Sequence, residues 1–190
     1  MKGVKQKFFD ITNLIQAEFD RNMDIYGDKI QCRRGCSKCC SQIFRITALD
    51  GWIIAEHVKS LPEPRRSELQ QKAREYLSNL PKPTDGQILQ HEGVPCPALG
   101  AEGECTIYEA RPVICRRFGM PIYDYKNPAN VNACELNFKD GDEITDALLV
   151  PNQTAIGKKW DELKAEFGDG ATTIAEAIAQ LPFDSTKGDM

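Results

Sequence analysis

A dense group of cysteines between residues 32 and 40 is the part of this sequence best suited to chemistry. Four of the eight cysteines fall there, in the pattern C-x3-C-x2-C-C: Cys32, Cys36, Cys39 and Cys40. Thiolates at such short spacings can converge on one metal centre. Structural thiols are the alternative, because free cysteine is a common small core residue. Arg33 and Lys38 make the stretch polar, however, and the pattern therefore predicts metal ligation.

The other four cysteines lie further along the chain, beside glycines, prolines and arginines: Cys96, Cys105, Cys115 and Cys134. Several thiolates around one metal carry negative charge, which nearby guanidinium groups offset and tune. Arg111 and Arg116 are close in sequence to these cysteines. We predict that all eight cysteines are metal ligands and that Arg111 and Arg116 contact the bound cofactor. Surface salt bridging is the alternative role for either arginine.

Eight thiols are enough for two four-cysteine zinc sites, and equally enough for an iron–sulfur cluster of the 4Fe–4S type. Adjacent Cys39 and Cys40 are expected to point in different directions, so that one of them reaches a different metal or packs without ligating. The C-x3-C-x2-C spacing also occurs in radical enzymes that bind S-adenosylmethionine. Lys38 stands where an aromatic is usual in those enzymes, and the strand–helix alternation of their barrel is missing. We expect an iron–sulfur cluster first and Zn²⁺ as the alternative.

Evidence for a reaction is much thinner than evidence for a metal. A cysteine nucleophile would need a nearby base, and His57 and His91 are the only histidines. His91 precedes Cys96 by five residues, but nothing else marks the two as a catalytic pair. The sequence has no phosphate-binding glycine motif and no zinc-protease helix. It therefore predicts a metal site and leaves open whether the protein is an enzyme.

Length and composition indicate an ordinary globular protein. A chain of 190 residues is long enough to bury a core without cross-links, and we expect one domain over residues 1–183. Its cysteine-rich core spans about residues 30–135, and residues 184–190 form a flexible tail. The net charge of −4 argues against nucleic-acid binding, and no stretch is apolar enough to cross a membrane. Polar residues interrupt the N-terminal apolar pattern, so we expect a cytoplasmic protein with reduced thiols.

Helical patterns must position these cysteines. Apolar residues three and four apart predict a helix over residues 3–25. Thr47 and Asp50 have the spacing of a capping box for a second helix that ends before Pro62. The remaining expected elements are an extended stretch at 43–46, helices at 67–80 and 154–167, a helical turn at 106–110, a final helix from Thr172 or Thr173 to Leu181, a connector at 81–86 and a loop at 121–132. The predicted class is mainly α, a single helical domain with long irregular loops folded around a cysteine-ligated metal centre.

Two strings of residues resemble a known family. They are C-x3-C-x2-C-C at residues 32–40, and C-x-I-Y-x2-R-P-x2-C-R at residues 105–116, with Cys96-Pro97-x-Leu99 between them. Together they resemble the YkgJ-type cysteine-cluster family, whose domain is described as zinc- or iron-chelating. The resemblance covers roughly residues 30–120, and implies chelation by the cysteines within it. Cys134 lies beyond the matched strings and is added as the eighth thiol.

The resemblance leaves the biological role open between three possibilities. A distantly similar cysteine domain in flagellin lysine methylases, where an iron–sulfur centre is implied, favours a redox or protein-modification enzyme or accessory with a protein substrate or partner. No residue here matches a methyl-donor or lysine site, so methylation is not carried over. The alternative is a zinc-binding structural or interaction module with four-cysteine sites and no catalysis. A metal carrier with exposed, labile ligands is the third possibility.

Overall fold

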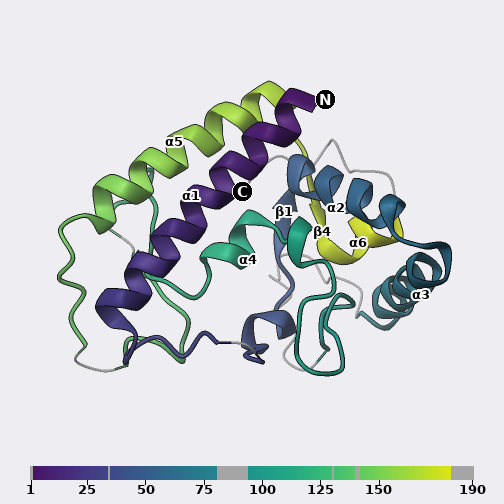
Figure 1. The fold of residues 1–190 in the computed structure, drawn as a ribbon, viewed down its shortest axis with the longest axis horizontal. Helices are drawn as coiled ribbons and strands as arrows, with labels where there is room; N and C mark the ends of the chain where they lie inside the picture. Colours follow the sequence, from purple (N-terminus) through teal and green to yellow (C-terminus); the bar gives the residue numbers. More distant parts are fainter. Residues whose placement is uncertain (1, 34, 81–93, 130, 140–141, 181–190) are drawn as a thin grey trace. The chain divides into compact units, whose positions relative to one another are not determined.

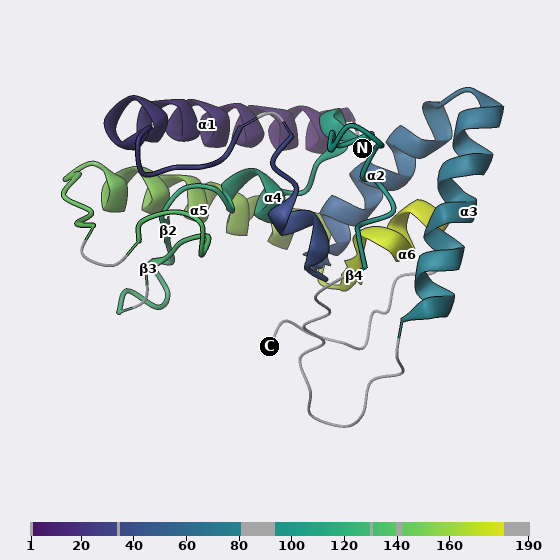
Figure 2. The ribbon, with the colours of Figure 1, turned by 90° about the horizontal axis from the view of Figure 1, so that it is seen from below.

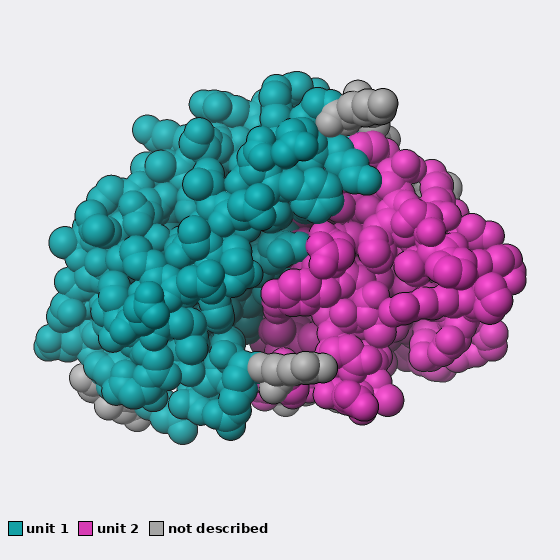
Figure 3. Space-filling model, in the orientation of Figure 1, with its two compact units in different colours: residues 1–33, 113–167 teal, residues 34–112, 168–190 magenta. Residues whose placement is uncertain are grey.

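The computed structural model describes residues 2–33, 35–80, 94–129, 131–139 and 142–180. The chain forms two compact units, each built from two separate stretches of sequence (Figure 3). Unit 1 comprises residues 1–33 and 113–167, and unit 2 comprises residues 34–112 and 168–190. Helices dominate, and strands are few and short (Figure 1), which confirms the mainly α class. The single domain predicted over residues 1–183 stays a prediction, while the 81–86 connector, His91 and the 184–190 tail lie outside the described residues.

Two long helices form the frame of unit 1. Helix α1 (Lys2–Tyr26) lies along helix α5 (Leu149–Phe167) in both views (Figures 1 and 2). The apolar face of α1 supplies the buried side chains, and the ring of Phe8 meets that of Trp160 at a centroid distance of 6.0 Å. The helix predicted from residue 3 is confirmed. Helix α5 ends before Gly168 as predicted but begins at Leu149, earlier than predicted, because Pro151 is tolerated in a first turn.

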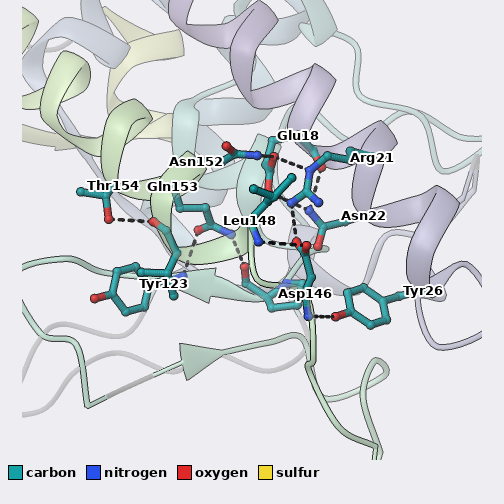
Figure 4. A network of polar contacts seen from close by, with 12 residues as sticks. Glu18, Arg21, Asn22, Tyr26, Tyr123, Asp146, Leu148, Asn152, Gln153 and Thr154 are labelled. Carbon is teal, nitrogen blue, oxygen red and sulfur yellow. Dashed lines mark hydrogen bonds and ion pairs between the residues drawn. The ribbon is translucent and has the colours of Figure 1, made fainter.

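A buried network of charged and amide groups joins α1 to the start of α5 (Figure 4). Arg21 lies between two carboxylates, with its Nη2 at 2.6 Å from both Glu18 and Asp146. The side chains of Glu18 and Asp146 are only 4% and 9% exposed. Asn152 donates a further hydrogen bond to Glu18 at 2.8 Å. The Arg21 hydrogen bond holds the pKa of Asp146 below its usual range.

The loop predicted over residues 121–132 contains a small hairpin, so that prediction is wrong in part. Strand β2 (Ile122–Tyr123) pairs antiparallel with strand β3 (Val131–Asn132). A side chain from α5 supports β2, because the buried amide of Gln153 accepts a hydrogen bond from the backbone N–H of Tyr123 at 2.9 Å. The sequence signal failed because these strands are two residues long and depend on a partner far along the chain.

In unit 2, two distant segments pair to form the second small sheet. Strand β1 (Arg45–Thr47) lies antiparallel to strand β4 (Ala171–Thr173), with Ile46 opposite Thr172. Each strand runs directly into a helix, α2 (Ala48–Ser60) and α6 (Ile174–Ala179), and these two helices pack together. The extended stretch predicted near residues 43–46 is thus a short strand shifted toward Thr47.

Both helices that follow this sheet begin with a capping box. The Thr47 hydroxyl oxygen accepts from the backbone N–H of Asp50 at 3.1 Å, and the Asp50 carboxylate accepts from the backbone N–H of Thr47. Thr173 and Glu176 repeat the arrangement at α6, with an N–H to oxygen distance of 3.2 Å. The predicted box at Thr47 and the predicted threonine cap of the last helix are both confirmed.

The remaining helices of unit 2 are one long helix and two short turns. Helix α3 (Glu63–Asn79) begins before the predicted Ser67, because Pro64 occupies its first turn rather than preceding the helix. The 3₁₀ turns η1 (Lys38–Ser41) and η2 (Tyr108–Ala110) lie beside cysteines, and η2 packs against α2. Within the described part of the chain, no helix combines the length and apolar character needed to cross a membrane.

Candidate metal centre

Four cysteines gather in unit 2, where three segments are joined through their backbones. Turn η1 carries Cys39 and Cys40, and is closed by the backbone N–H of Cys40 donating to the carbonyl of Ser37 at 2.8 Å. The backbone N–H of Cys96 donates to the carbonyl of Cys40 at 2.6 Å, which holds the two segments together. Cys96 is therefore brought to the cysteine-rich loop despite its distance in sequence.

A tight loop returns the chain from Cys96 to Cys105. Leu99 and Cys105 face each other in an isolated antiparallel bridge, and the backbone N–H of Thr106 donates to the carbonyl of Ala98 at 2.8 Å. The glycine-rich stretch between them closes with a hydrogen bond from the N–H of Gly100 to the carbonyl of Glu104. Cys96 and Cys105 therefore lie at the start and the end of one tight loop.

Two glycines allow the loop that contains Cys36 and the loop between Cys96 and Cys105 to lie close together. Gly35 and Gly103 both have positive φ angles, +90° and +80°, which favour glycine. A Cβ on Gly103 would lie 3.1 Å from the carbonyl oxygen of Gly35, a close approach that only a bare Cα permits without a shift. Cys36 follows directly after Gly35 and is half-buried in the same loop.

The four thiols interact electrostatically with one another. Interaction with the neighbouring Cys40 thiol lowers the pKa of Cys39, and Arg111 lowers it further. The same interaction, burial and the charges of Cys39, Cys96 and Cys105 raise the pKa of Cys40. Burial raises the pKa of Cys96 to about 12, with Cys105 and Cys39 adding to the effect. The expectation that Cys39 and Cys40 point in different directions stays a prediction.

One predicted arginine lies beside these thiols. Nη2 of Arg111 is 4.0 Å from the sulfur of Cys39, and its guanidinium lies over the ring of Tyr108 at 5.9 Å from the centroid. Arg116 lies in unit 1 on helix α4 (Val113–Arg117), directly after Cys115. Tyr76 of α3 was not singled out from the sequence, although its pKa is raised by burial and by the charge of Cys96. The structure thus gives the thiols a cationic neighbour and a phenol within electrostatic range.

The other three cysteines belong to unit 1: Cys32, Cys115 and Cys134. Cys134 is buried, while Cys32 and Cys115 are half-buried. The Nδ2 of Asn137 donates to the sulfur of Cys32 at 3.7 Å, and its backbone N–H donates to the carbonyl of Cys134 at 2.8 Å. Asn137 has no functional signal in the sequence beyond its position three residues after Cys134.

The donor chemistry suits zinc or iron, since thiolates are soft ligands that both metals accept. None of the eight cysteines is joined in a disulfide. As the side chains are placed in the described residues, no three Cys, His, Asp or Glu groups are arranged so that they could hold a metal ion. These side chains would therefore have to turn toward a metal to ligate it.

The fold and the thiols define a mainly helical, cysteine-rich chain. Residues 31–135 match the model of the CxxCxxCC family, described as "Putative zinc- or iron-chelating domain", and the chain belongs to this family. The match reaches past the predicted limit of residue 120 and includes Cys134. Neither the curated proteins nor the solved structures gave a match to this chain. The likeness to flagellin lysine methylases stays a prediction.

Proposed function

We propose that Cys39, Cys40, Cys96 and Cys105 hold one metal centre, and that this centre is an iron–sulfur cluster. The observation that carries the proposal is the backbone geometry of unit 2, in which the N–H of Cys96 donates to the carbonyl of Cys40 at 2.6 Å and Cys105 pairs with Leu99, with Arg111 beside Cys39. Four thiolates are the usual ligand set of such a cluster. Arg111 would offset part of their negative charge and donate a hydrogen bond to one sulfur.

The adjacency of Cys39 and Cys40 favours a cluster over a single zinc ion. Two neighbouring residues must turn both sulfurs onto the same ion to complete a tetrahedral zinc site, whereas a cluster offers a separate iron atom to each thiolate. When bound, a cluster would supply one-electron redox chemistry, and a zinc ion would supply a structural cross-link. We therefore place the protein among redox or protein-modification enzymes or their accessories, with a zinc-stapled interaction module as the second candidate.

The other four cysteines are proposed as further ligands: Cys32, Cys36, Cys115 and Cys134. Arg116, next to Cys115, is proposed to act toward a bound cofactor as Arg111 does. All of them lie within the segment that matches the family. We assign each of these cysteines as a ligand without grouping them into sites. The metal content per chain would show how many sites they form.

The test is elemental and sulfide analysis of full-length protein purified without oxygen, with single Cys→Ser variants. We expect iron, acid-labile sulfide and a brown colour in the wild type. Cys39→Ser and Cys96→Ser should lose the same share of metal, and the double variant should lose no more than either one, because both belong to one centre. Ser37→Ala is the matched control, since this residue lies in the same loop and its side chain makes no capping hydrogen bond to η1.

A second measurement avoids mutants that fail to fold. Alkylation of the wild type followed by peptide mapping should show Cys39, Cys40, Cys96 and Cys105 protected together and becoming reactive together when a chelator removes the metal. Full metal content in folded Cys39→Ser would overturn the proposed centre. Stoichiometric zinc without colour or sulfide would replace the cluster by the zinc-stapled module.

A further inference from the structure

Asn137 is a buried amide whose hydrogen-bonding atoms are all committed, one of them to a cysteine sulfur. The residue is 3% exposed. The Oδ1 accepts from the backbone N–H of Gln31 at 2.8 Å. The Nδ2 donates to the carbonyl of Gly119 at 2.6 Å and to the sulfur of Cys32 at 3.7 Å. One amide therefore connects three segments of unit 1 around a single thiol.

The orientation of this amide follows from its partners. If it were turned over, Oδ1 would face the carbonyl oxygen of Gly119, and Nδ2 would face the backbone N–H of Gln31. Both contacts would set like against like, acceptor against acceptor and donor against donor. The N–H group therefore has to face the sulfur of Cys32, which makes the sulfur an acceptor.

The main chain at Gly119 also lies against the sulfur of Cys32. A Cβ on Gly119 would fall well inside contact distance of the Cys32 sulfur and 3.1 Å from its Cβ. The sulfur consequently lies against bare main chain, on the same residue whose carbonyl accepts from Asn137. A side chain at this position would displace the thiol from its hydrogen-bond donor.

A strained residue next to Asn137 holds it in place. Phe138 has a φ of 47°, in the left-handed region that a bulky residue rarely adopts. Its backbone N–H donates to the carbonyl of Lys29 at 3.2 Å, and its ring meets that of Tyr26 edge-on at 5.3 Å. The surroundings thus enforce a conformation that the chain would not take alone, as is common around functional groups.

We infer that Asn137 is a positioning residue that orients the sulfur of Cys32 and stabilises it as a thiolate ligand through an N–H···S hydrogen bond. This inference rests on the proposed metal-binding function, in which Cys32 is one of the ligands. Hydrogen bonds from groups outside the ligand shell fix the direction of ligands and reduce the negative charge on sulfur. Asn137 lies just beyond the segment that matches the family.

The test uses Co²⁺ as the probe, because it accepts thiolate ligands and gives a sulfur-to-metal charge-transfer band. Full-length wild type, Asn137→Leu and Asn137→Asp are titrated with Co²⁺ after removal of native metal. We expect affinity to fall about 10- to 100-fold in both variants, as is typical when such a hydrogen-bond donor is lost. The band should also move to longer wavelength, because sulfur orbitals rise in energy without the donor.

Gln153 provides the matched control in the same unit. It is an equally buried amide that donates to the carbonyl of Pro121 at 2.5 Å and accepts from the backbone N–H of Tyr123. It also accepts from Arg117 at 3.1 Å, and none of these hydrogen bonds involves sulfur. Gln153→Met should lower stability as Asn137→Leu does, yet leave the Co²⁺ band unmoved. Asn137→Asp keeps the size and the acceptor for Gln31, so it covers the case in which Asn137→Leu fails to fold.

Two outcomes would overturn the inference. One is an unmoved band and unchanged affinity in folded Asn137 variants, and the other is an equal loss of binding in Gln153→Met, which would make both amides merely structural. Cys32→Ser and Cys39→Ser separate this inference from the proposed function. If only Cys39→Ser loses Co²⁺, the centre in unit 2 stands and the role of Asn137 falls. If neither variant loses Co²⁺, the proposed function itself fails.

Discussion

Replacing Gly119 with alanine tests whether the sulfur of Cys32 has to lie against the main chain. The added methyl would meet three atoms at once, the sulfur and Cβ of Cys32 and the Cε2 of Phe19. The Cβ of Cys32 would be at 3.1 Å and the Phe19 ring atom at 3.0 Å. Since carbon atoms rest at about 3.5–4.0 Å, each neighbour must recede by roughly 0.5 Å and the sulfur by more.

The cost follows from overpacking and not from backbone strain, because the φ of Gly119 is not among the positive values. Overpacking of this kind costs about 1–3 kcal/mol, partly offset by about 0.4–1 kcal/mol from the lower chain entropy of alanine in the unfolded state. We expect a net loss of about 1–2 kcal/mol. The effect on metal should be larger, because a ligand displaced beyond about 0.2 Å no longer fits its bond.

The assays are urea unfolding and metal analysis of the purified protein. Gly3→Ala is the control, since Gly3 lies in helix α1 with no atom within 4 Å of the added methyl. It should stabilise the protein by about 0.5–1 kcal/mol and leave metal content unchanged. A Gly119→Ala protein with wild-type stability and full metal content would refute the steric argument.

Two further predictions concern the charged network and the glycine contact. Arg21→Met should cost about 3 kcal/mol in urea unfolding at neutral pH, because it leaves the buried Glu18 and the half-buried Asp146 carboxylates without their cation. Since the pKa of Asp146 is lowered in the folded state, this contribution is present above its unfolded pKa and lost as the pH falls through the folded pKa. The difference in unfolding free energy between Arg21→Met and the wild type should therefore shrink in acid, and a constant difference would contradict the assignment. As a control, replacing the exposed Lys7 with Met should cost less than about 1 kcal/mol. Gly103→Ala should lose about 1–2 kcal/mol from its positive φ, plus a packing cost against Gly35 that lowers metal content. Gly168→Ala has the same type of φ and no close atoms, so equal losses and equal metal content in the two variants would show that the Gly35 contact is unimportant.

Local signals in the sequence were sufficient for the helices whose ends depend on neighbouring residues. The apolar spacing of α1, the capping box at Thr47 and the end of α5 before Gly168 involve contacts within a few positions. Such contacts act already in a short peptide segment, so their residue types are readable directly. The starts of α3 and α5 were placed too late, because a proline in a first turn looks the same in sequence as a proline before a helix.

Pairings between distant segments left no comparable signal. Strand β1 meets strand β4 across more than a hundred residues, and each is only three residues long. The hairpin of β2 and β3 depends on Gln153 in the same way. Strands this short have little intrinsic preference, so the partner that supports them decides whether they form.

For the candidate site, the sequence by itself determined the chemistry: eight cysteines, their spacing and the family they belong to. Tertiary structure decided which groups lie near them, bringing Cys96 to Cys40 through a backbone hydrogen bond and Arg111 to the sulfur of Cys39. It also decided the role of Asn137, which contacts Cys32 from 105 positions away. The physical reason is that a thiol's capacity to bind metal resides in its own atoms, whereas its neighbours and hydrogen-bond donors exist only once the chain has folded.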